Sequence, residues 1–188
     1  MRKFLLKVKE KRTLPEKKKP RSDKDESDFI GSNISFTASE AYKMLRTKIQ
    51  YSFAGDKTSR VIGISSALSG EGKSLSAINL AYSLSQLGKK VILIDCDMRR
   101  PSLPDKLPIQ KKPGLSGFLS GQAQEQTMFQ YCGIPNDEQA FHVVSAGQIP
   151  PNPVELLSSV KMAKMLNVIK SKWICSFAFS CKRSCTPK

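Results

Sequence analysis

The sequence predicts an α/β fold in which helices cover both faces of a mostly parallel sheet. A β-branched run at residues 61–64 leads through a polar loop into an amphipathic segment at 75–87, which ends at Gly88. A second apolar run at 91–94 follows at once and is typical of a strand buried on both faces. Strand, helix and strand in this order are the pattern of a parallel sheet.

The loop between the first strand and its helix has the composition of a phosphate-binding loop. Glycines have no Cβ, so they let the main chain curl close to a polyphosphate and hold it with N–H groups. Lys73 is then expected to reach the β- and γ-phosphates, and the Ser74 hydroxyl to hold Mg²⁺ at the helix N-terminus. We therefore predict a P-loop NTPase-like fold with ATP and Mg²⁺ as cofactors. The predicted nucleotide-binding residues are Ser69, Gly70, Glu71, Gly72, Lys73, Ser74 and Leu75.

Two acids follow the second strand. Asp95 and Asp97 stand in the motif I-L-I-D-C-D-M-R-R-P. Because ligands of open α/β sheets bind at the carboxyl ends of the strands, both side chains are expected beside the phosphate loop. An acid in this position can also cap a following helix. The loop one helix upstream favours a role at the nucleotide, although Ala67 stands where the Walker A pattern has glycine.

Caps and periodicity predict the flanking elements. A helix is expected at 37–53, with Thr37 as N-cap and Glu40 completing a capping box. Another is expected to begin at Pro153, because proline suits the first helical position. The predicted elements after the second strand are helices at 115–119, 122–134 and 153–171 and a strand at 141–145.

The loop motif G-E-G-K-S, taken together with I-L-I-D-C-D-M-R-R-P, resembles the bacterial tyrosine kinases of capsule and exopolysaccharide synthesis. The resemblance covers residues 33–172 and includes G-L-S-G-F-L-S-G and G-Q-I-P-P-N-P-V-E-L-L-S-S. It implies a P-loop autokinase, a transferase that moves the γ-phosphoryl group of ATP to tyrosine hydroxyls. It also implies that Lys73, Asp95 and Asp97 are catalytic and that Ser74 and Asp95 hold Mg²⁺.

Two other functions stay open. One is a partition-type P-loop ATPase acting on DNA or membrane. Proteins of that kind carry a signature lysine early in the loop, where this chain has Leu68, and this difference favours the kinase. The other is an inactive remnant that binds nucleotide.

The helix expected at 37–53 carries a charged stripe of Glu40, Lys43 and Arg46. On physical grounds alone the stripe is a solvated ladder, worth about 0.2–0.5 kcal/mol per pair. The resemblance implies instead an E-x-x-R-x-x-R motif through which subunits assemble into a ring. Lys43 replaces the first arginine, which keeps the charge but loses the planar fork, so we expect a weakened contact. The resemblance further implies activation by the cytoplasmic tail of a separate membrane polysaccharide co-polymerase.

The net charge is +15, and ten lysines or arginines lie within residues 1–21. Because this segment has few apolar residues and two prolines, residues 1–31 are predicted to form a disordered basic tail. We expect no nucleic-acid partner, and weak contact between the tail and a membrane surface is allowed. The sequence has no run of 18 apolar residues and no secretory signal, so a cytoplasmic protein is expected.

The end of the chain departs from the resembled family. Its members continue from the helix at 153–171 into an apolar strand that ends in the Walker B aspartate. Here residues 173–181 alternate like a strand, but no Asp or Glu follows Glu155. We interpret residues 173–188 as an aberrant tail left by a frameshift or premature stop. The predicted kinase domain at 32–172 is therefore partial, with an incomplete sheet and little or no activity.

Overall fold

The computed structural model describes residues 4–7, 30–52, 61–68, 70–133, 140–170 and 174–178, the first and last as backbone only. Within these residues a six-stranded sheet has the order β1-β2-β6-β3-β5-β4. The strands are β1 (Phe4–Lys7), β2 (Val61–Ser65), β3 (Val91–Asp95), β4 (Gln130–Gly133), β5 (Ala140–Val144) and β6 (Ile174–Ala178). β4 is antiparallel to β5, and the other pairings are parallel. The predicted α/β fold with a mostly parallel sheet is confirmed.

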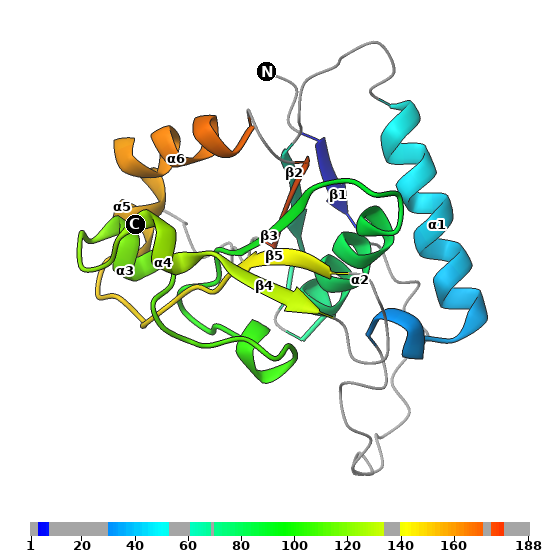
Figure 1. Ribbon diagram of the computed structural model, residues 1–188, viewed down its shortest axis with the longest axis horizontal. Helices are drawn as coiled ribbons and strands as arrows, with labels where there is room; N and C mark the ends of the chain where they lie inside the picture. Colours follow the sequence, from blue (N-terminus) through cyan, green and yellow to red (C-terminus); the bar gives the residue numbers. More distant parts are fainter. Residues whose placement is uncertain are drawn as a thin grey trace.

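Helices cover both faces of the sheet. Figure 1 shows α1 and α2 on one side and α3 to α6 on the other. None of the helices in the described ranges has the length and apolar character needed to span a membrane. The helices are α1 (Phe36–Tyr51), α2 (Lys73–Ser85), α3 (Leu115–Leu119), α4 (Glu125–Met128), α5 (Pro153–Ser158) and α6 (Val160–Lys170), with 3-10 turns η2 (Gly31–Asn33) and η3 (Leu103–Asp105).

β3 joins the two hydrophobic layers, because all five of its side chains are buried. Val91 and Leu93 pack in the core that includes α1 and α2. Ile92 and Ile94 point to the opposite face and pack with α3 and α6. Full burial of a Val, Leu or Ile side chain is worth about 1.5–3 kcal/mol. The apolar run seen in the sequence is thus the strand that holds both layers to the sheet.

The start of α1 differs from the prediction. The helix begins at Phe36, and Ser35 is its N-cap, with Oγ accepting a hydrogen bond from the N–H of Ala38 at 3.3 Å. The predicted capping box of Thr37 and Glu40 is wrong because Thr37 already lies inside the helix, whereas a cap needs non-helical backbone angles. Ser35 has them, with φ −57° and ψ 152°.

The second half of the chain also departs from the prediction in two places. The helix expected at 153–171 is divided at Ser159, which has extended angles and accepts a hydrogen bond from the N–H of Met162 at 3.2 Å, so that it caps α6. The helix expected at 122–134 is only α4, and the chain then forms β4. β4 lies at the edge of the sheet and pairs with β5, where the Tyr131 ring meets the His142 ring edge-on at 5.4 Å between centroids.

Two motifs that carry the family resemblance pack against each other. The N–H of Leu115 donates to Ser145 O at 2.8 Å, and that of Ser116 donates to Ala146 O at 2.9 Å. A Cβ on Gly114 would lie 2.4 Å from the main-chain nitrogen of Gly147, a distance that real atoms do not adopt. Glycine is therefore needed where the start of α3 meets the loop after β5.

Strands form in both regions that were predicted to lie outside the domain. β1 lies within the tail predicted to be disordered over 1–31, and its residues Phe4–Lys7 pair with β2, whereas residues 8–29 lie outside the described ranges. An edge strand offers unpaired N–H and C=O groups, to which a short segment can add. β6 lies within the predicted aberrant tail, yet it occupies the middle of the sheet between β2 and β3.

Candidate nucleotide-binding site

The predicted phosphate loop leads directly into α2. Gly72 is the N-cap of this helix with φ +80°, and Gly70 has φ +84°. Residues with a Cβ rarely adopt these backbone angles, so the backbone conformation alone favours glycine at both positions. Leu75 packs its side chain against the core, which leaves only its main chain to face a ligand. Ser69 lies outside the described residues.

Charged side chains of the loop bond to the loop itself. The Lys73 ammonium donates to Ser66 Oγ at 2.8 Å and to Leu68 O at 3.0 Å. Glu71 accepts a hydrogen bond from the N–H of Leu68 at 2.9 Å, and this bond is the main reason that the pKa of Glu71 is lowered. The Lys73 side chain thus extends from the start of α2 across the loop, as far as Ser66 and Leu68.

The two acids at the end of β3 have different environments. Asp95 is buried, and its Oδ1 accepts from the N–H of Asp97 at 2.9 Å. Burial raises the pKa of Asp95 to about 7. Asp97 is half-buried, and its Oδ1 accepts from the N–H of Arg100 at 3.0 Å. Asp97 therefore caps the following turn, as the alternative interpretation of an acid after a strand allowed.

A further polar residue, Ser102, joins the two halves of the site. Its hydroxyl lies 2.8 Å from that of Ser74 in the first turn of α2. Its main-chain N–H, like that of Leu103, lies close enough to Asp95 to favour the charged carboxylate. Sequence reasoning missed Ser102, because a serine one residue beyond the acidic motif carries no signal of its own.

The central strand β6 ends beside the same residues. In the register of the sheet, Ala178 pairs with Ile64 on one side and with Asp95 on the other. The end of β6 is therefore enclosed by the strand that enters the phosphate loop and the strand that carries the acids. Within the described part of β6 no residue is acidic.

These groups suit a nucleotide bound with Mg²⁺. Asp95 Oδ2 is buried and has no hydrogen-bond partner among the described residues, which is costly unless a cation or donor approaches it. Carboxylate and hydroxyl oxygens are ligands that Mg²⁺ takes. The described residues contain no group of three His, Cys, Asp or Glu side chains that could hold a metal alone. Mg²⁺ in proteins is usually held by one or two carboxylates together with substrate phosphates.

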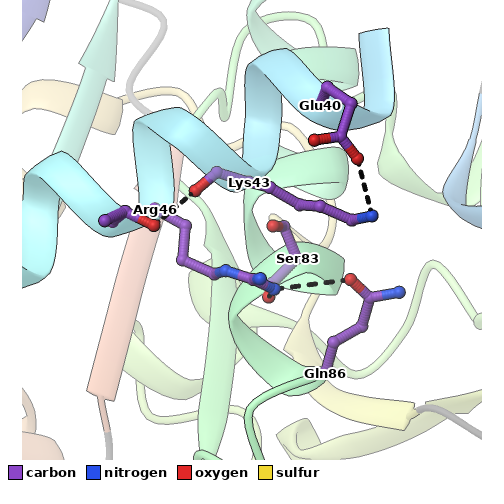
Figure 2. A network of polar contacts seen from close by, with 6 residues as sticks. Glu40, Lys43, Arg46, Ser83 and Gln86 are labelled. Atoms are coloured by element: carbon purple, nitrogen blue, oxygen red, sulfur yellow. Dashed lines mark hydrogen bonds and ion pairs between the residues drawn. The ribbon is translucent and has the colours of Figure 1, made fainter. Parts of the chain in front are cut away.

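The charged stripe of α1 divides into two contacts (Figure 2). Lys43 pairs with Glu40 at 2.8 Å, and both side chains are nearly half exposed. Arg46 instead turns toward α2, where its Nη1 donates to Ser83 O at 2.6 Å and approaches Gln86 Oε1 at 3.5 Å. The stripe is thus an exposed ion pair beside an arginine already bonded within the chain.

Comparison with known proteins identifies the family. The sequence model of the ParA family, described as "NUBPL iron-transfer P-loop NTPase", matches residues 57–172. The chain belongs to this family of P-loop NTPases. A solved MinD protein from Pyrococcus horikoshii in complex with Mg-ADP shares the fold, with a TM-score of 0.52 at 22% identity over 64% of this chain and 48% of that one.

Several more similar proteins are named tyrosine kinases. The chain is 38% identical over 127 residues to tyrosine-protein kinase YwqD of Bacillus subtilis, a match covering 68% of this chain and 52% of YwqD. The kinase domain of Escherichia coli tyrosine kinase ETK superposes with a TM-score of 0.74 at 25% identity, covering 88% of this chain and 63% of that domain. The BceF tyrosine kinase domain superposes with a TM-score of 0.65 at 34% identity, covering 75% of this chain and 54% of that one. The resemblance to bacterial tyrosine kinases is confirmed, and the chain spans about half the length of YwqD.

Proposed function

We propose that the chain is the nucleotide-binding domain of an ATP-dependent protein-tyrosine kinase, an autokinase that regulates the synthesis and export of capsular polysaccharide or exopolysaccharide. The observation that carries this proposal is the phosphate loop with Lys73 and Ser74, joined through Ser102 to Asp95, in a chain whose relatives are named tyrosine-protein kinases. The chain spans about half the length of YwqD, so we propose, by analogy with such relatives, the activity of a complete kinase domain.

Each residue of the site has a task in this reaction. The loop N–H groups and Lys73 hold the phosphates, and Lys73 exchanges its bond with Leu68 O for a phosphate oxygen. Ser74 and Asp95 hold Mg²⁺, which when bound neutralises charge on the β- and γ-phosphate oxygens. Asp97, two residues beyond Asp95, accepts the tyrosine proton or supports the metal. Catalysis then rests on positioning and charge neutralisation.

The position of β6 bears on the activity of this chain. The resemblance predicts an aspartate at the end of this strand, and the register places Ala178 beside Ile64 and Asp95. No acid occurs in the sequence after Glu155. A misplacement near 1 Å can cost about 10²-fold in rate, so the loss of a carboxylate is expected to cost more. We infer that this chain binds Mg-ATP and transfers phosphate at or near background.

The proposal includes partners and location. The domain is cytoplasmic and is activated by the cytoplasmic tail of a membrane polysaccharide co-polymerase, which also brings it to the membrane. Subunits assemble through the α1 face that carries Glu40 and Lys43. Arg46 can join this contact only if its hydrogen bond to Ser83 O breaks. The basic segment at 1–21 adds weak contact with anionic lipid.

Labelled ATP tests this function. The full chain is incubated with Mg²⁺ and labelled ATP, with and without the co-polymerase tail, beside a version in which residues 173–188 are replaced by the corresponding C-terminal segment of YwqD. We expect phosphotyrosine in the second version and its loss in the same version carrying Lys73→Met. No phosphotyrosine in either version would contradict the kinase proposal. ATP hydrolysis stimulated by DNA would favour the partition-type ATPase instead, an alternative that the ParA family match keeps in view.

A further inference from the structure

Ser102 uses its hydroxyl in an unusual way for a serine at the start of a helical turn. It is the N-cap of η3, a position where serine commonly accepts a hydrogen bond from the turn that follows. Here the side chain makes no capping bond. Its Oγ lies instead 2.8 Å from Ser74 Oγ, on the helix that begins at the phosphate loop. The hydroxyl is thus directed into the candidate site.

The main chain around Ser102 is anchored. Leu103 is completely buried in the core shared with α2. The N–H groups of Leu103 and Ser102 lie beside the Asp95 carboxylate. One short segment therefore contacts Ser74 through a side chain, and its main chain passes near Asp95, the other residue expected to hold Mg²⁺.

A serine hydroxyl has one hydrogen and two lone pairs. For Ser74 to offer a lone pair to a cation, its hydrogen must point elsewhere, toward an acceptor. Ser102 Oγ lies at hydrogen-bonding distance and can accept that hydrogen. The described part of β6, which runs between the two halves of the site, provides no acidic acceptor for it.

We propose that Ser102 is a positioning residue of the metal and nucleotide site. Its hydroxyl accepts the hydrogen of Ser74 and so turns the Ser74 lone pairs toward Mg²⁺, while its main chain keeps Asp95 near the same point. This inference rests on the proposed binding of Mg-nucleotide. It does not require the chain to transfer phosphate.

The test measures how much Mg²⁺ strengthens ADP binding. Calorimetry gives the ADP dissociation constant of the full chain with Mg²⁺ and with EDTA, and the ratio of the two constants is the metal-dependent gain. We expect Ser102→Ala to reduce this gain about 5- to 10-fold and to leave the EDTA value unchanged. Ser102→Thr keeps the hydroxyl and should retain most of the gain.

A double-mutant cycle with Ser74→Ala tests whether Ser102 acts through Ser74. Once Ser74 lacks its hydroxyl, Ser102→Ala should have no further effect on the gain. Thermal melts of every variant check folding, and Ser102→Cys, a near-isostere with a weak acceptor, gives a second reading if the alanine variant unfolds.

Three results would overturn the proposal. The first is equal weakening of ADP binding with and without Mg²⁺ in Ser102→Ala, which means a structural role. The second is an unchanged gain in both Ser102→Ala and Ser102→Cys. The third is the absence of any gain in the wild-type chain, which would also contradict the proposed Mg²⁺ site. A missing kinase activity with a normal gain leaves the Ser102 inference standing and contradicts only the kinase proposal.

Discussion

Replacement of Arg46 by alanine should destabilise the fold, because Arg46 completes the end of α2. The last carbonyls of a helix lack partners within it and carry the negative end of the helix dipole. The N–H of Leu87, four residues after Ser83, bonds to Leu84 O. Arg46 supplies the bond to Ser83 O, at 2.6 Å. It thereby joins α1 to the helix that begins at the phosphate loop.

The expected loss follows from the kind of bond. A hydrogen bond that involves a charged group contributes about 1.5–3 kcal/mol, and a cation at a helix C-terminus about 0.3–1 kcal/mol. The contact is only partly buried, so water recovers some of this loss. We expect Arg46→Ala to lower the free energy of unfolding by about 1–2 kcal/mol. In a domain of this size that is a fall of about 2–4 °C in Tm per kcal/mol.

Lys43→Ala is the matched control, since Lys43 lies one turn earlier on the same helix and carries the same charge. Its exposed pair with Glu40 is worth about 0–1 kcal/mol. Urea unfolding of the two variants and the wild type, read by circular dichroism, gives the comparison. If Arg46→Ala is as stable as the wild type, or if Lys43→Ala costs as much, the assignment of Arg46 as the α2 cap is refuted.

Three other outcomes are expected. Asp95→Asn should stabilise the metal-free chain, because the folded state raises the pKa of the Asp95 carboxyl from 3.8 to about 7. As the pH rises through that interval, the stability of the wild type should fall relative to that of the variant by an amount on the order of 3 kcal/mol. If the difference in Tm between the two proteins is the same at pH 4 and pH 8, this prediction is contradicted. Gly114→Ala should cost more than the roughly 1–3 kcal/mol of ordinary overpacking, whereas Gly133→Ala, which meets nothing within 4 Å, should cost little; equal Tm values would refute the packing argument. Replacing residues 173–188 with the corresponding C-terminal segment of YwqD should raise phosphotyrosine formation at least about 10²-fold, and robust transfer by the unaltered chain would show that the metal site is misplaced.

The parts of the fold that the sequence predicted well are those set by local pattern. The run at 91–94 in β3 is apolar at every position, as expected of a strand whose two faces are both covered. The glycines of the loop could be recognised because their positive φ angles exclude other residues. α2 (Lys73–Ser85) begins and ends two residues before the predicted segment 75–87, and its place between the loop and Gly88, whose φ is +66°, was predicted.

The parts that could not be predicted depend on tertiary contacts. The middle position of β6 is not visible in a linear pattern, since the order of parallel strands is set by packing of the helices between them. β4 is a four-residue edge strand that depends on its pairing with β5. At the site, the spacing of Asp95 and Asp97 was informative, but the contact of Ser102 with Ser74 and that of Arg46 with Ser83 join residues 28 and 37 positions apart.

The most direct test of the proposed nucleotide site is a calorimetric titration of the full chain with ATP in the presence of Mg²⁺, compared with Lys73→Met. The Lys73 ammonium bonds within the loop, to Ser66 and Leu68. It is also the group expected to meet the β- and γ-phosphates. We expect saturable, stoichiometric binding by the wild type and its loss in the variant. Equal affinity in the two proteins, or no binding by a folded wild type, would contradict it.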